Sequence, residues 1–100
     1  MIRHLVMWTL KETAEGAPAV ENAKKMKTML EGLAGKIPGL THIEVSHDIV
    51  GADPECHIAL CSEHGTEEDL QVYQKHPLHL ACVDFVKKVV SARRGLDYRV

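Results

Sequence analysis

The sequence predicts an α+β fold in which one four-stranded antiparallel sheet has helices on one face only. Three observations predict it. Four segments have the residue alternation of strands, and two regions have apolar residues spaced three or four apart, as helices do. These segments follow one another in the order β-α-β-β-α-β. Because 100 residues bury enough surface for a single modest core, we expect one domain over residues 1–100.

Residues 2–11 form the first predicted strand, and this strand is apolar on both faces. Leu5 and Met7 alternate with the apolar residues of the other face, which are Ile2, Val6, Trp8 and Leu10. Because helices cover only one side of such a sheet, the second apolar face must pack against something else. We expect it to meet the same face of a second copy, so that two sheets form a barrel and the protein is a symmetric homodimer.

Residues 17–33 have the spacing of a helix. Pro18 lies near the start, where proline is tolerated, and Gly32 or Gly35 is expected to end the helix. The predicted buried stripe is mostly apolar and consists of Val20, Ala23, Lys27, Leu30 and Leu33.

Residues 40–50 and 56–63 are the second and third predicted strands. Their apolar faces hold Ile43, Val45 and Ile49 in the first of the two, and Cys56, Ile58 and Leu60 in the other. The four residues 51–54 between them, Gly-Ala-Asp-Pro, are typical of a turn.

The region from Thr66 onward predicts two helices separated at Pro77. Thr66 precedes three acidic residues, a pattern typical of a helix N-cap. Pro77 is expected to end one helix and begin the next, because it has a fixed φ and no backbone donor. The second helix should run to about Lys88, and residues 91–100 form the last predicted strand, with Leu96, Tyr98 and Val100 on one face. The complete order is that of the ferredoxin-like fold.

The composition is that of an ordinary soluble globular protein, with 45% apolar residues, 26% charged residues and a net charge of −2. It differs from that of disordered chains and lacks the positive surplus typical of nucleic-acid-binding proteins. The uncharged stretches are shorter than the roughly 20 residues of a membrane helix, and the first residues lead into a strand instead of a signal peptide. We therefore expect a cytoplasmic protein that contacts neither nucleic acid nor membrane.

The break at Pro77 brings titratable rings together. His76 and His79 are three positions apart and can share a face, and Tyr73 lies on the turn before them. Histidine titrates near pH 6.5 and a tyrosine hydroxyl can orient a carbonyl, so this cluster is capable of acid–base chemistry. The alternative is a purely structural role, with His76 as a helix cap, His79 bonded to a backbone carbonyl and Tyr73 in the core. Two histidines alone do not complete a metal site, so no metal is expected.

Four motifs resemble the stress-responsive α/β-barrel domain family. They are Arg3-His4-Leu5-Val6-Met7-Trp8, Ile37-Pro38-Gly39-Leu40, Tyr73 with His76-Pro77-Leu78-His79, and Asp97-Tyr98, and they span nearly the whole chain. The resemblance implies a dimeric α+β barrel with a small cavity between sheet and helices, in a family whose members mostly have no settled biochemical role. The first hypothesis is therefore a homodimer that binds a small organic ligand in this cavity, without a cofactor.

One branch of that family, the plant polyketide cyclases typified by olivetolic acid cyclase, is similar at the histidine and tyrosine motif. In that branch the cavity performs an intramolecular aldol condensation. The similarity implies that His79 is the acid/base residue, that Tyr73 places the substrate and that His4 lines the pocket. Trp8 and His76 are expected to contact the ligand as well.

The second hypothesis is therefore an acid/base enzyme that uses His79 and Tyr73, either cyclase-like or a lyase or isomerase of carbonyl compounds. Whether the chain is an enzyme stays open at this point. A cofactor-free or haem-linked monooxygenase is disfavoured, because the motifs belong to the other family. The basic pairs Lys87-Lys88 and Arg93-Arg94 could attract an anion, although such charge runs are usually solvated.

Overall fold

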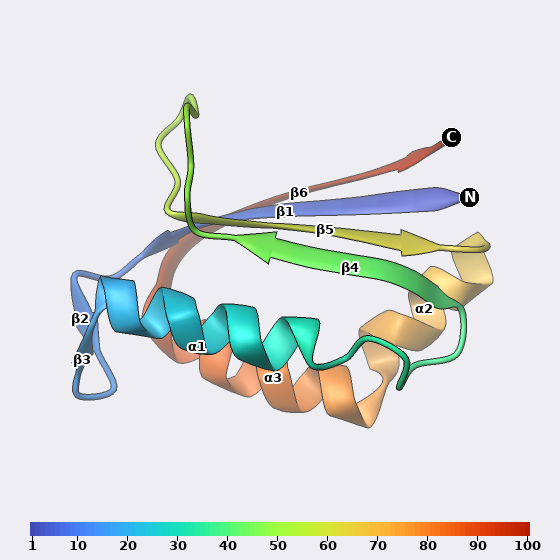
Figure 1. The fold of residues 1–100 in the computed structure, drawn as a ribbon, viewed down its shortest axis with the longest axis horizontal. Coiled ribbons are helices and arrows are strands. Elements are labelled where there is room, and N and C mark those ends of the chain that lie inside the picture. The colour runs from blue at the N-terminus through green and yellow to red at the C-terminus, as the bar shows by residue number, and fades with distance from the viewer.

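The structure, a computed structural model, describes residues 1–100 and has one four-stranded antiparallel sheet with three helices against one of its faces (Figure 1). This confirms the predicted ferredoxin-like α+β fold. The elements are β1 (Ile2–Leu10), β2 (Thr13–Ala14), β3 (Ala17–Pro18), α1 (Ala19–Glu31), β4 (Leu40–Ser46), β5 (Ile58–His64), α2 (Glu67–Lys75), α3 (Pro77–Val89) and β6 (Val90–Arg99). None of the helices is both long enough and apolar enough to cross a membrane.

The sheet has the strand order β4-β5-β1-β6, with β1 in its interior. Its register places His4 of β1 opposite Ser62 of β5 on one side and opposite Asp97 of β6 on the other. All neighbouring strands are antiparallel. The register therefore gathers polar side chains from three strands at one point of the face that meets the helices.

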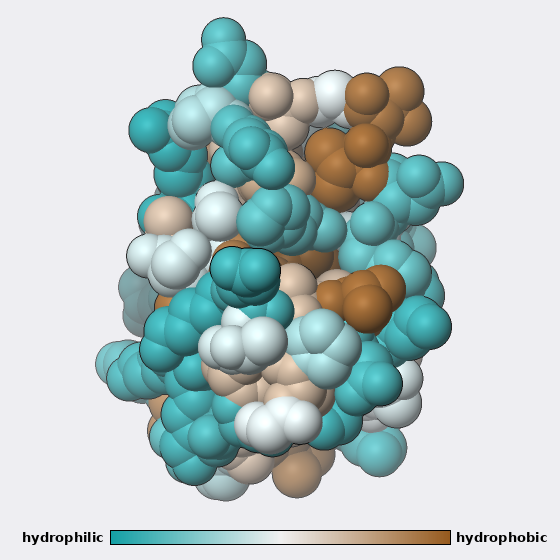
Figure 2. Space-filling model, turned by 90° about the vertical axis from the view of Figure 1, so that its left-hand side faces the viewer, coloured by the Kyte–Doolittle hydropathy of each residue, from teal (hydrophilic) through white to brown (hydrophobic).

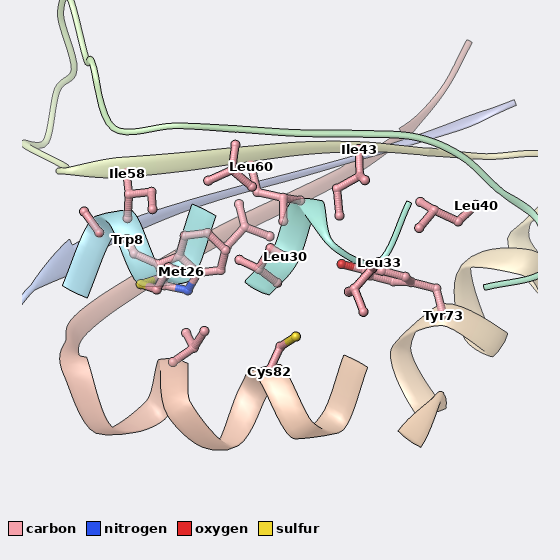
Figure 3. Packing of buried hydrophobic residues seen from close by; sticks show 14 of the residues in the cluster. Trp8, Met26, Leu30, Leu33, Leu40, Ile43, Ile58, Leu60, Tyr73 and Cys82 are labelled. Atoms are coloured by element: carbon pink, nitrogen blue, oxygen red, sulfur yellow. The ribbon is translucent and has the colours of Figure 1, made fainter. Parts of the chain in front are cut away.

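The hydrophobic core lies between this face and the helices (Figure 3). Ile2, Val6, Trp8 and Leu10 of β1 contribute to it, and His4 takes the remaining buried position on the same face. Met26 and Leu30 of α1 pack against these strand residues from the helical side. The predicted inner face of the first strand is thus confirmed.

The first helix is shorter than predicted. Residues 17 and 18 pair with residues 13 and 14 in a small two-stranded hairpin, so the helix begins at Ala19 instead of Ala17. The side-chain amide of Asn22 donates to the carbonyl of Ala14 at 3.0 Å and is fully buried. This anchor turns Asn22 and Met26 inward, and Val20, which the helical stripe was expected to bury, is 58% exposed.

The second strand also ends earlier than predicted, at Ser46 instead of residue 50. The Ser46 hydroxyl accepts a hydrogen bond from the backbone N–H of Asp48 at 3.2 Å, a local bond that competes with continued strand pairing. The following loop rises from the sheet on the side away from the helices (Figure 1). Val50 in this loop is fully exposed, and Figure 2 shows hydrophobic surface near the top of the molecule, where the loop lies.

The helix break at Pro77 has the predicted form. Thr66 caps α2, because its hydroxyl accepts from the N–H of Asp69 at 3.1 Å. His76 ends α2 and is the N-cap of α3, with its ring Nδ1 accepting from the N–H of Leu78 at 3.1 Å. Pro77 is the first residue of α3, and the break places the ring of Tyr73 in α2 beside that of His79 in α3.

Candidate functional site

A cavity of about 260 Å³ lies between the inner face of the sheet and the helices. Its wall is mainly apolar and is formed by Val6, Trp8, Leu30, Leu60, Val83 and Val86. His4, Tyr73 and His79 form a polar region of the same lining. Four of the five predicted site residues, His4, Trp8, Tyr73 and His79, therefore meet at one cavity.

The aromatic rings of this polar region lie close to one another. The ring centroids of Tyr73 and His79 are 4.3 Å apart, and those of His4 and Tyr73 are 6.0 Å apart. Tyr73 comes from the last half of α2, His79 from the first turn of α3 and His4 from the interior strand β1. The helix break and the strand register together create this cluster.

His79 is held in a defined tautomer. Its Nδ1 lies 3.2 Å from the carbonyl oxygen of Gln74, and because a carbonyl can only accept, Nδ1 carries the proton. The Nε2 atom of the neutral ring is then free to accept a proton. Burial lowers the pKa of His79 below 6.5, although the bond to Gln74 acts in the opposite direction. The ring is therefore neutral at pH 7 and suited to act as a base.

His4 forms a pair with a carboxylate. The ring is 6% exposed, and its Nδ1 contacts the carboxylate of Asp97, directly opposite on β6. A carboxylate that fixes one nitrogen of an imidazole orients the ring and leaves the other nitrogen for a ligand. The sequence alone did not assign Asp97 a place in the site, because the pairing partner of His4 depends on the strand register.

Tyr73 supplies a hydroxyl that the protein does not use. The residue is 1% exposed, and burial raises the pKa of its phenol well above 10, so the hydroxyl keeps its proton. No side-chain hydrogen bond of the structure involves this hydroxyl, which points into the space between the sheet and α3 (Figure 3). It is therefore a donor available to a ligand in the cavity.

His64 is a buried ring that the sequence analysis did not single out. It has no exposed surface, its Nε2 lies 2.9 Å from the Ser62 hydroxyl, and its Nδ1 has no hydrogen-bond partner. Its centroid lies 4.8 Å from that of Tyr73. Burial, and next the nearby His4, lower the pKa of His64 to about 4. Continuing the alternation of β5 two residues beyond Ser62 would have placed His64 on the inner face.

Of the two residues predicted to contact the ligand beside the candidate catalytic cluster, Trp8 lines the cavity and His76 does not. His76 instead caps α3, although its charge acts on the nearby ring of His79 and lowers the pKa of that ring. Trp8 does line the cavity, is 5% exposed, and has an indole N–H without a partner. No group of three or more His, Cys, Asp or Glu side chains is arranged to hold a metal ion.

A second hollow, of about 360 Å³, lies on the opposite face of the sheet. Its apolar side chains come from β1, β5 and β6 and include Leu5, Met7, Ala59, Cys61 and Leu96. Glu44 and Arg94 border it. This is the second apolar face that the first strand predicts, and no element of the chain covers it.

The sequence matches the stress-responsive A/B barrel domain family over residues 2–100. No curated protein matches it.

Solved structures share the whole fold. A dimeric ferredoxin-like protein of unknown function from Bacteroides fragilis is 25% identical, with a TM-score of 0.83 over 99% of this chain and 95% of that one. A Dabb family protein from Mesorhizobium loti is also 25% identical, with a TM-score of 0.77 over 99% of this chain and 95% of that one. The hydroxynitrile lyase from Passiflora edulis is 15% identical, with a TM-score of 0.78 over 99% and 92% of the two chains.

Proposed function

Because this chain belongs to the stress-responsive A/B barrel domain family, we propose that it is a cytoplasmic homodimer that binds a small organic ligand between sheet and helices. The observation that carries the proposal is a cavity with apolar walls in which some polar atoms have no protein partner. The Tyr73 hydroxyl and the Nε2 atom of His79 are both available there. The indole N–H of Trp8, which lines the same cavity, is buried without a partner, and buried polar groups are normally satisfied, so its free state favours a ligand.

The size of the cavity limits the ligand. An apolar cavity of roughly 150 Å³ is enough to bind benzene. The cavity of about 260 Å³ found here thus suits a compound with one ring or a short chain and a polar group.

The uncovered face of the sheet supports the dimer. Leu96 is 59% exposed and Met7 is 37% exposed, and both lie on the face that the helices leave free. A second copy that packs the same face against it would bury the sheet-face hollow of each copy. The B. fragilis protein of the same fold is described as dimeric.

Trp8 makes the binding proposal directly testable, because it is the only tryptophan and lines the cavity. Titration with a panel of small aromatic and alkyl carbonyl compounds should give a saturable change in Trp8 fluorescence. Val83→Phe should abolish the change, because the larger side chain fills the cavity at a partly exposed position. The proposal fails if no compound alters the emission, or if Val83→Phe binds as the wild type does.

A second candidate is acid–base catalysis in the same cavity, favoured by the fixed tautomer of His79 beside Tyr73. His79 Nε2 would remove a proton from the carbon next to a substrate carbonyl. Tyr73 would donate a hydrogen bond to the enolate oxygen, and the imidazolium would return the proton. A hydroxynitrile lyase has this fold, so the fold accommodates lyase chemistry.

Exchange of substrate protons for deuterium tests this candidate. Small enolisable ketones in D₂O should exchange faster with the protein than in buffer, and His79→Gln should reduce the enhancement by about 10²- to 10⁴-fold. Tyr73→Phe should lower the rate while leaving some exchange. If the ketones exchange at the buffer rate, or if His79→Gln exchanges as fast as the wild type, His79 is not the base.

A further inference from the structure

Two positively charged side chains border the cavity, and each comes from a basic pair in the sequence. Lys87 and Arg93 belong to the cavity lining. Their sequence neighbours point elsewhere: Lys88 is 3.8 Å from Glu15, and Arg94 lines the hollow on the other face of the sheet. The fold therefore divides each pair and brings one cation of each to the cavity.

The guanidinium of Arg93 lies in the space left by the missing side chain of Gly95. Arg93 lies opposite Trp8 in the sheet register and on the same face as Gly95 and Asp97. A Cβ atom at Gly95 would lie 3.0 Å from a terminal nitrogen of Arg93, so the missing side chain leaves room for the guanidinium. The charge of Arg93 also reaches the ring of His79, where it lowers the pKa less than burial does.

Neither cation has a carboxylate partner in the chain. The seven ion pairs of the structure include neither Arg93 nor Lys87. The carboxylate of Asp97, four residues further along the same face of β6, contacts His4 instead. An unpaired guanidinium beside an apolar cavity is suited to a planar anion, because its donors match the two oxygens of a carboxylate.

We propose that the ligand is an organic carboxylate whose apolar body fills the cavity and whose carboxylate binds Arg93, with Lys87 adding a second positive charge. The inference rests on the proposed ligand-binding function and specifies its ligand class. The carboxylate stays at the solvent-facing side, where Arg93 is exposed, so only the apolar part of the ligand is fully desolvated.

A matched pair of probes separates charge from shape. 3-Phenylpropanoate and 3-phenylpropanamide have nearly the same size, and only the first carries a charge. We expect the acid to bind roughly tenfold tighter than the amide, as read by Trp8 fluorescence and calorimetry, since a charged hydrogen bond is worth about that factor. Raising the salt concentration should lower the affinity for the acid and leave the affinity for the amide unchanged.

Variants then assign the preference to Arg93. Arg93→Gln should remove most of the preference for the acid and leave only the part that Lys87 contributes. Arg93→Lys should keep more of the preference because the charge at position 93 remains. Gly95→Ala should also reduce it by displacing the guanidinium. Lys88→Gln is the matched control, since it removes a neighbouring charge outside the cavity and should leave both affinities unchanged.

The outcomes distinguish this inference from the proposal beneath it. If acid and amide bind equally, or if Arg93→Gln keeps the preference, the carboxylate inference is wrong while the cavity remains a binding site. If neither probe binds and no compound of the wider panel binds, the ligand-binding function fails and this inference fails with it. Arg93 is exposed on an edge strand, so its variants should fold, and circular dichroism checks this.

Discussion

His64 has a ring nitrogen without a partner in the interior of the protein, and this has a cost at low pH. Protonation would place a positive charge where the ring has no exposed surface and where His4 is close. The nearby carboxylates of Asp69 and Asp97 offset this only in part, because burial remains the largest influence on the pKa. The folded protein therefore favours neutral His64.

The expected result is a loss of stability in acid. The pKa of His64 falls from 6.5 to about 4 on folding, so its contribution is complete above pH 6.5 and is lost as the pH falls towards 4. The full loss amounts to about 3 kcal/mol, at roughly 1.4 kcal/mol for each pKa unit. Urea unfolding at pH 7 and pH 4.5 should show that His64→Phe is much less sensitive to acid than the wild type.

His42 provides the control for this experiment. It is exposed on β4 and paired with Glu44, so His42→Gln should keep the acid sensitivity of the wild type. The burial argument is wrong if His64→Phe loses as much stability at pH 4.5 as the wild type does.

The sequence predicted individual site residues where they belong to a motif. His4, Trp8, Tyr73 and His79 were predicted, and the structure places all of them at one cavity. Their proposed roles remain predictions. Asp97 could not be assigned, because a cross-strand partner depends on a register that a single sequence does not fix.

Among the contacts between elements, the packing of the α1–β4 loop against α2 depends on Gly39. Its φ of +81° is in the left-handed region, and a Cβ atom there would lie 2.3 Å from the Asp69 side chain in the first turn of α2. Gly39 thus allows a loop to approach a helix closely. Gly35 has a similar φ of +75° but no atom within 4 Å of such a Cβ.

These two glycines separate backbone strain from contact. Gly35→Ala should cost about 1 kcal/mol of unfolding free energy, because only the left-handed backbone is strained. Gly39→Ala should cost about 2 to 3 kcal/mol, because the same strain is joined by a clash with Asp69. Chemical denaturation of both variants measures the difference, and equal losses would show that the close approach to α2 has no energetic weight.

Elements long enough to show a residue pattern were predictable, and very short elements were not. The strands of the main sheet and the helix break at Pro77 follow from alternation and from proline chemistry. The hairpin formed by β2 and β3 has two residues in each strand, which is too short for any period to show. Its presence moved the start of α1 and changed which residues of that helix are buried.

The whole molecule presents an uncovered sheet face. Its association with a second copy can be tested by introducing one charged residue there. Leu96 on this face is 59% exposed, and Val20 on α1 is 58% exposed. Leu96→Glu should convert a dimer into a particle of 11.1 kDa in analytical ultracentrifugation, because it places a charge in the interface. Val20→Glu, at equal exposure but outside the sheet face, should leave the dimer intact. A wild-type protein that sediments at 11.1 kDa at micromolar concentration contradicts the dimer.

The sequence predicted the need for a partner surface from one strand with two apolar faces, and the structure shows that surface uncovered. It did not predict the loop that follows β4 and rises on the same side, because the apolar residues of that segment continue the strand pattern beyond Ser46. Local hydrogen bonding at Ser46 decided where the strand ended.

Residues 1 and 100 are immediate neighbours, since the N–H of Val100 donates to the carbonyl of Met1 at 2.9 Å. A short peptide could therefore join them, and the chain could be opened instead in the exposed loop after β4. Such a circular permutant would keep every strand pairing of the sheet. The cavity would then be assembled from a chain that starts at β5, which makes the fold a scaffold whose ends can be relocated away from the ligand site.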